Sequence, residues 1–182
     1  MDQKTDAEIV ARVLNGDKQA YALLIDAYKG PVFNLAFRMT GSYSDADDLS
    51  QEAFIKSYQK LHQFNPEKKF FTWLYTISIN LIRNHLRKKK RNVLIFSKDY
   101  LLNEPSAQEQ ESREEDLLSE DMMIRLDDCL RRLPIDLREA IILKYHQNMT
   151  FDDVAAITGD KVSAVKMRIY RGLKSLEKMI KK

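Results

Sequence analysis

The chain has 182 residues, of which 44% are hydrophobic and 31% charged, with a net charge of +3, so it can bury a core and keep a hydrated surface. Five glycines and four prolines favour helices over an all-β architecture, and a single cysteine, Cys129, excludes an intramolecular disulfide and a thiolate zinc cluster. Apolar runs are far shorter than the roughly 18 residues of a membrane span and the start of the chain lacks a signal-peptide pattern, so we expect a cytoplasmic, mostly helical protein.

Charge is distributed very unevenly along the chain. Basic residues outnumber acidic ones eight to one in residues 64–92 and again in residues 161–182, whereas eleven acidic residues face three basic ones in residues 93–130. Two basic blocks separated by an acidic one indicate a polyanionic partner that is contacted at two places. The plainer alternative is that lysine-rich helix ends only keep the chain hydrated.

The first forty residues are predicted to form three helices. Asp6 can cap the first, which carries Ile9, Val13 and Leu14 on one face and ends at a turn near residues 15–17. The second is expected over about 18–29 and the third over about 32–40, with Gly30-Pro31 separating them.

Two long helices follow, and then the composition changes. Ser44 or Asp45 is expected to cap a helix that runs to about residue 62, and another helix is expected over about 71–91. Residues 93–120 are acidic and poor in apolar side chains, which predicts a flexible linker; alternatives are a spacer that keeps the domains apart or a nucleic-acid mimic that fills a basic channel. We therefore expect an all-α fold with domains at residues 1–92 and 121–182.

The C-terminal segment has the pattern of a helix-turn-helix. Leu133-Pro134 begins a helix, Thr150 caps a short second helix with Asp153 at the capping-box position, and Gly159 provides the turn. The last helix carries an apolar stripe at Val162, Val165, Ile169, Leu173, Leu176 and Ile180. Its opposite, basic face suits a DNA major groove, although an ordinary basic helix on a three-helix bundle would look similar.

A second candidate DNA-binding face lies on the helix expected over 71–91. Two amides and four cations share one side of it, at positions 80, 83, 84, 87, 88 and 91. Amides can hydrogen-bond base edges and cations can hold phosphates. The aromatic residues just before this face could stack on unpaired bases, but Phe70, Trp73, Leu74, Ile77 and Leu81 also form a good core stripe, and we assign most of them, Trp73 included, to the core.

A third stretch, residues 45–54, places Asp48, Gln51 and Glu52 on one exposed helical face. This pattern is compatible with a solvated acidic face, with a docking surface for a basic partner helix, or with a metal-dependent nuclease that uses Asp47, Asp48 and Glu52. The three histidines are isolated in the sequence, and the chain lacks phosphate-binding, zinc-protease and serine-hydrolase motifs. We therefore expect no catalysis, no metal, no cofactor and no small-molecule substrate.

These stretches, in this order, resemble an extracytoplasmic-function sigma factor of bacterial RNA polymerase, close to the sigma-E type. The resemblance rests on residues 13–17, on residues 47–54, on residues 72–77 with Asn80, on Leu133-Pro134 with Leu137-Arg138, and on Val165-Lys166 with Arg168 and Tyr170-Arg171. It covers nearly the whole chain. It implies a promoter-specificity subunit that binds core enzyme and helps to open promoter DNA; a stand-alone helix-turn-helix regulator is the alternative.

The resemblance also implies roles for residues. Asp48, Gln51 and Glu52 would dock on the β′ clamp helices, and the C-terminal domain would sit on the β flap. The −10 element would be contacted by Phe64, Lys68, Lys69, Asn80, Arg83, Asn84, Arg87 and Lys88. The −35 element would be contacted by Ser163, Lys166, Met167, Arg168, Tyr170, Arg171 and Lys174. An anti-sigma factor at the inner membrane face would cover the DNA contacts.

Overall fold

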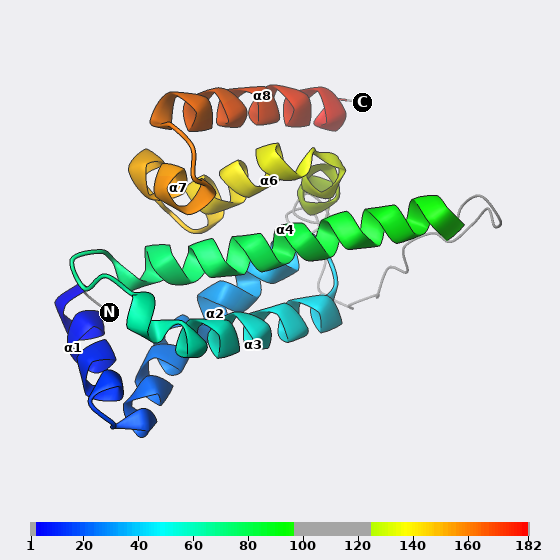
Figure 1. Ribbon diagram of the computed structural model, residues 1–182. Helices are drawn as coiled ribbons and strands as arrows, with labels where there is room; N and C mark the ends of the chain where they lie inside the picture. Colours follow the sequence, from blue (N-terminus) through cyan, green and yellow to red (C-terminus); the bar gives the residue numbers. More distant parts are fainter. Residues whose placement is uncertain (1–2, 97–124, 182) are drawn as a thin grey trace, which may run out of the picture.

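A computed structural model describes residues 3–96 and 125–181, and within these ranges the chain forms helices and turns without a strand (Figure 1). This confirms the all-α prediction. The elements are α1 (Gln3–Leu14), η1 (Lys18–Ala20), α2 (Tyr21–Thr40), α3 (Tyr43–Gln59), η2 (Leu61–Gln63), α4 (Phe70–Phe96), a helical stretch over 125–132, α6 (Ile135–Ile141), the π-helical η3 (Ile142–His146), α7 (Phe151–Thr158) and α8 (Val162–Ile180).

The start of the chain differs from the prediction in one respect. Asp6 lies inside α1 rather than at its cap, and it is almost fully buried. The hydroxyl of Tyr28, from α2, donates a hydrogen bond to its carboxylate over 2.5 Å. A buried carboxylate needs such donors. Tertiary packing therefore places Asp6 inside the helix, whereas local capping rules predict it at the helix end.

The prediction that Gly30-Pro31 separates two helices is wrong, because α2 runs unbroken from Tyr21 to Thr40. A proline usually forces the preceding residue out of the helical region by meeting its Cβ atom, and Gly30 has none. Leu24, Tyr28 and Leu35 lie on one buried face across the proline. Burial of that face outweighs the hydrogen bond that the proline removes.

The next two helices begin and end at slightly different residues from those expected. The cap of α3 is Ser42, whose hydroxyl accepts the Asp45 backbone N–H, and not Ser44 or Asp45. The following helix, α4, continues to Phe96 and so takes up the start of the predicted linker. The remainder of that acidic linker, residues 97–120, lies outside the described residues.

The C-terminal helices follow the predicted order closely. Thr150 and Asp153 form the expected capping box at the start of α7, and Gly159 adopts a left-handed φ of 75°. The apolar stripe of α8 is buried at Val165, Ile169 and Leu176, but Leu173 and Ile180 are 40% and 57% exposed. Gly172 is buried instead, because the absence of a side chain there lets Ile141 pack against the helix.

The two halves of the chain pack on each other around a continuous core. In Figure 1, α4 runs through the middle, with α2 and α3 on one side and α6 and α7 on the other. Leu74 and Ile79 from α4 belong to the same buried cluster as Ile142 and Val154. No helix in residues 3–96 or 125–181 is both long and apolar enough to span a bilayer.

Candidate nucleic-acid and polymerase interface

The first candidate surface, the α3 face, consists of Asp48, Gln51 and Glu52, and all three are exposed. The buried side of the same helix carries Ala46, Leu49 and Ala53. Helical periodicity therefore turns the acidic residues outward. Glu52 pairs with Lys56 over 2.6 Å, so the face keeps a net negative charge through Asp48.

A metal site on the same helix is the alternative that the sequence leaves open. Gln51 donates a hydrogen bond to Asp47 over 2.9 Å, and the Glu52 carboxylate is paired with a lysine. In the part of the chain that the structure describes, no three His, Cys, Asp or Glu side chains gather closely enough to hold a metal ion. The geometry of this helix suits docking better than metal chemistry.

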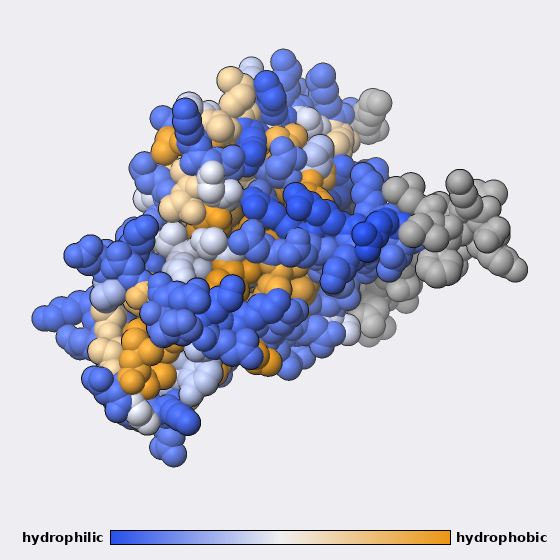
Figure 2. Space-filling view, viewed as in Figure 1, coloured by the Kyte–Doolittle hydropathy of each residue, from blue (hydrophilic) through white to orange (hydrophobic). Residues whose placement is uncertain are grey.

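The second candidate surface, the α4 face, consists of Asn80, Arg83, Asn84, Arg87 and Lys88. Four of these residues are exposed, and the exception is Arg83. Figure 2 shows hydrophilic side chains covering the outer part of α4. Their exposure leaves two amides and two cations accessible to a ligand, and these are the side-chain types that contact bases and phosphates.

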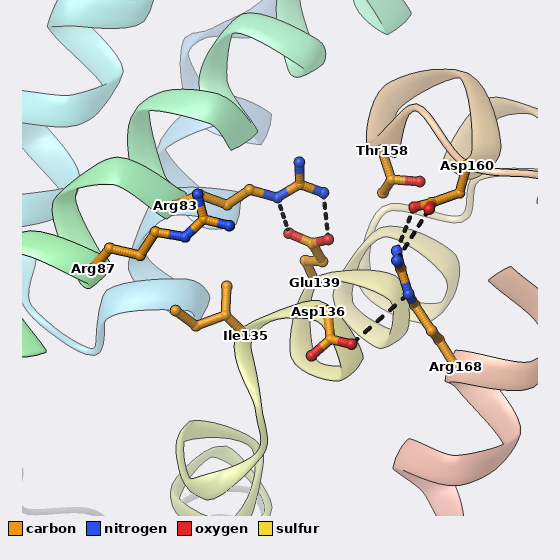
Figure 3. A pocket seen from close by; sticks show the side chains of 8 residues that line it. All are labelled: Arg83, Arg87, Ile135, Asp136, Glu139, Thr158, Asp160 and Arg168. Atoms are coloured by element: carbon orange, nitrogen blue, oxygen red, sulfur yellow. Dashed lines mark hydrogen bonds and ion pairs between the residues drawn. The ribbon is translucent and has the colours of Figure 1, made fainter. Parts of the chain in front are cut away.

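Arg83 points away from solvent toward the C-terminal half. Its Nε and Nη2 atoms donate hydrogen bonds to the two carboxylate oxygens of Glu139, over 2.6 Å and 2.5 Å (Figure 3). Burial raises the pKa of the Glu139 carboxyl group, and the hydrogen bonds from Arg83 oppose that rise. The same hydrogen bonds raise the pKa of Arg83, which keeps the guanidinium charged.

The loop before α4 presents lysines at its surface and an aromatic residue beneath them. Lys68 and Lys69 are exposed, and the ammonium group of Lys69 pairs with Asp153 of α7 over 3.1 Å. Phe64 is buried against the rings of Phe70 and Trp73. The ring of Phe64, expected to contact the −10 element, is therefore a core side chain that is not exposed in this structure.

Most of the aromatic stripe belongs to the core, as the sequence predicted. Phe70 and Leu74 are fully buried, and Leu81 is nearly so. Trp73 and Ile77 are partly buried and pack against the same cluster. Stacking on unpaired bases by Phe70 or Trp73 would require this core to open.

The third candidate surface, the α8 face, consists of Ser163, Lys166, Met167, Tyr170, Arg171 and Lys174. All six are exposed on the second helix of the helix-turn-helix. Arg168, which was expected among them, instead turns toward Asp160 and forms a two-point ion pair with it. Its Nε atom also lies 3.8 Å from Asp136. Arg168 therefore stabilises the turn between α7 and α8, and its side chain is not part of the exposed α8 face.

Sequence reasoning did not identify the carboxylates that pair with Arg83 and Arg168, which are Glu139 and Asp160. Glu139 precedes the apolar run of residues 140–143, and a carboxylate on a buried face signals a buried cationic partner. That signal was present in the sequence. The identity of the partner was not, because Arg83 lies 56 positions away.

Comparisons with known proteins match both halves of the chain to one protein family. The family models "Sigma-70 region 2" and "Sigma-70, region 4" match residues 24–92 and 123–176. The chain is 31% identical to the RNA polymerase sigma-H factor of Pseudomonas aeruginosa, over 99% of this chain and 96% of that protein. It is 32% identical to the ECF RNA polymerase sigma factor SigW of Bacillus subtilis, over 94% and 95%.

A solved structure shares the fold and a quarter of the aligned residues. The sigma factor RpoE from Bartonella quintana, in complex with the anti-sigma factor NepR, superposes with a TM-score of 0.67 and 25% identity. The match covers 90% of this chain and 96% of that one.

Proposed function

This chain belongs to the extracytoplasmic-function sigma factors of the sigma-70 family, and we propose a separate role for each of its three exposed faces. The protein is a promoter-specificity subunit of RNA polymerase: it associates with core enzyme and promoter DNA and has no catalytic activity of its own. A stand-alone regulator is not favoured, because both region 2 and region 4 are present. Family membership also removes the nuclease alternative.

The α3 face docks on the β′ clamp helices, the α4 face with Lys68 and Lys69 engages the −10 element, and the α8 face engages the −35 element while the C-terminal domain contacts the β flap. The observation that supports this division is the exposure of one acidic and two basic or amide-rich faces on three different helices. Acidic residues suit a protein partner with basic helices, and the other faces suit a polyanion. Each DNA contact is individually modest, and engagement at two sites strengthens the whole.

Run-off transcription tests the function directly. Purified core polymerase is combined with this chain and a library of genomic promoter fragments from the source bacterium. We expect transcripts that require the chain and start at a common pair of sequence elements. A library that yields no chain-dependent transcript would contradict the proposal.

The role of the α3 face is tested separately. Asp48→Arg should abolish co-purification with core polymerase, because it places a cation against a basic partner. Asp26→Arg is the matched control, since Asp26 is likewise an exposed acid, lies on α2 and pairs with Lys29. Equal retention of both variants on immobilised core enzyme would remove the α3 face from the docking surface.

We also propose that this chain works in the cytoplasm and is held at the inner membrane face by an anti-sigma factor. The support is the similarity to a sigma factor solved with its anti-sigma factor. Cells that carry the tagged chain are fractionated before and after the signal that activates the sigma factor. The tagged chain should sediment with the membrane before the signal and appear in the soluble fraction afterwards. An unchanged soluble distribution would contradict the membrane part of this proposal.

A further inference from the structure

Helix α1 takes no part in the three candidate surfaces, and it precedes the segment that the region 2 family model matches, which begins at residue 24. Its start nevertheless lies beside the loop that leads into α4 (Figure 1). There the side-chain amide of Gln3 donates a hydrogen bond to the backbone carbonyl of Glu67 over 2.8 Å. The two residues are 64 positions apart, so this contact is a product of the tertiary fold.

The contacted loop, residues 65–69, is exposed along its whole length. It contains a tight turn, in which the backbone N–H of Lys68 donates to the carbonyl of Asn65 over 3.0 Å. The Asn65 side chain also accepts the backbone N–H of Glu67, over 2.9 Å. Asparagine followed by proline favours such a turn. These bonds set the shape of the turn, but they lie within the loop and do not fix it relative to the helices.

Both ends of the loop are anchored by aromatic rings in the core. Phe64 before it and Phe70 after it are buried, and their ring centroids lie 5.4 Å apart. The hydrogen bond from Gln3 adds a third point of attachment, on the exposed turn between these two anchors. Three points orient a segment, whereas two ends leave it free to swing about the line that joins them.

Helix α1 is itself firmly anchored. Its buried side packs into the core through Ile9, Val10 and Val13. The buried carboxylate of Asp6 accepts the hydrogen bond from Tyr28 over 2.5 Å, and the Tyr28 ring lies 5.7 Å from that of Phe70, the first residue of α4. Gln3 stands about one turn before Asp6 on the same helix. Its amide therefore reaches the loop from an element that is held against the start of α4.

We propose that α1 supports the 65–69 loop for DNA binding, with Gln3 as the positioning residue that sets the direction of Lys68 and Lys69. The two lysines follow directly after the bonded carbonyl, so the hydrogen bond fixes the backbone from which they extend. A loop that is ordered before binding does not lose that conformational entropy when DNA binds. This inference rests on the proposed role of both lysines at the −10 element.

The first measurement follows the loop in the free chain. Gln3→Met keeps the length of the side chain and removes the amide donor, and Gln3→Glu keeps its shape but offers only acceptors at pH 7. In both variants we expect the backbone amides of Glu67 and Lys68 to exchange with water about threefold faster, by NMR of the ¹⁵N-labelled chain. Gln19→Met makes the same change at an exposed glutamine of η1 and should leave these rates unchanged. Unchanged rates in both Gln3 variants would overturn the proposal.

The second measurement separates positioning from a merely structural role. Holoenzyme is titrated with a promoter fragment recovered by run-off transcription, at salt concentrations from about 50 to 200 mM. Each lysine that contacts a phosphate adds about one unit to the slope of log affinity against log salt. Gln3→Met should therefore lower the affinity about threefold at the lowest salt and also make the slope shallower. A smaller folded fraction lowers the affinity by the same factor at every salt concentration, so an unchanged slope overturns the proposal.

A double-mutant cycle ties the effect to the two lysines. In a chain that carries Lys68→Gln and Lys69→Gln, the addition of Gln3→Met should cause no further loss of promoter affinity. A further loss of the same size overturns the inference, because the amide then acts through other groups. Failure of the proposed function gives a different result. If the lysines have no role at the −10 element, the doubly substituted chain binds the promoter normally, whereas amide exchange in the free chain still reports whether Gln3 holds the loop.

Discussion

Gly159 turns the chain between α7 and α8 in a left-handed conformation, with φ of 75° and open space around the position of a Cβ atom. The strain of substitution is therefore purely a backbone effect. Gly159→Ala should destabilise the fold by about 1–2 kcal/mol, since left-handed backbone is unfavourable for residues with a Cβ atom. Gly159→Asn should cost less, because asparagine tolerates this conformation better.

Urea denaturation followed by circular dichroism measures both Gly159 variants. The comparison isolates the backbone, because neither side chain meets a neighbour within 4 Å at the Cβ position. Equal costs for alanine and asparagine would show that something other than the left-handed conformation determines the stability of the turn.

Two arginines on α8 that look alike in sequence should behave differently. Arg171 is exposed, and Arg171→Ala should weaken binding of holoenzyme to a −35-containing duplex by about 1–3 kcal/mol if it contacts a base. Arg168→Ala should mainly lower the free energy of unfolding, because Arg168 pairs with Asp160. Mobility shifts with holoenzyme and urea denaturation of the free chain separate the two effects; the reverse pattern would contradict the assignment.

At the level of elements, α7 begins with a capping box whose carboxylate also reaches the other half of the chain. Partial burial raises the pKa of Asp153, but hydrogen bonds from Thr150 and Lys69 outweigh it and hold the pKa below its ordinary value of 3.8. A group with a lowered folded-state pKa stabilises the fold above the unfolded value and loses that contribution as the pH falls through the folded value.

Asp153→Asn should therefore destabilise the chain by about 0.5–1 kcal/mol at pH 7, because it removes the charge that pairs with Lys69. The difference from the unsubstituted chain should decrease as the pH falls through the folded-state pKa of Asp153, which lies below 3.8. Urea denaturation at pH 7 and pH 3 measures this, with Asp152→Asn as a control that removes a first-turn charge outside the capping box. A difference that is the same at both pH values would exclude the carboxylate as its cause.

Local rules predicted some elements better than others. The capping box of α7 and the turn at Gly159 follow from neighbouring residues, and both were predicted correctly. The continuity of α2 through Pro31 was not, because it depends on burial of Leu24 and Leu35 against other helices. The helix propensity of individual residues contributes little to stability, and tertiary packing of this kind outweighs it.

At the level of the molecule, the continuous core predicts cooperative unfolding. Trp73 is the single tryptophan and reports on the N-terminal half, whereas circular dichroism reports on every helix. Because buried residues from both halves belong to one cluster, the two signals should follow a single urea transition. A tryptophan transition separated from that of circular dichroism would show that the halves unfold independently.

The sequence predicted which types of side chain form the candidate surfaces, but not which of those side chains are exposed. The acidic α3 face and the basic α8 face are exposed where periodicity placed them. Arg83, on the same predicted face as Asn80 and Asn84, is instead covered. A helical wheel assigns residues to a face, but it does not tell which part of that face another helix occupies.

The sequence by itself determined the all-α fold class, the helix-turn-helix and the membership of the sigma-factor family, because these follow from periodicity, turn residues and ordered motifs within short windows. Only the tertiary structure decided that the two halves share one core and that Glu139 holds Arg83. The physical reason is that this contact joins residues 56 positions apart, and its stability comes from burial that no local pattern encodes.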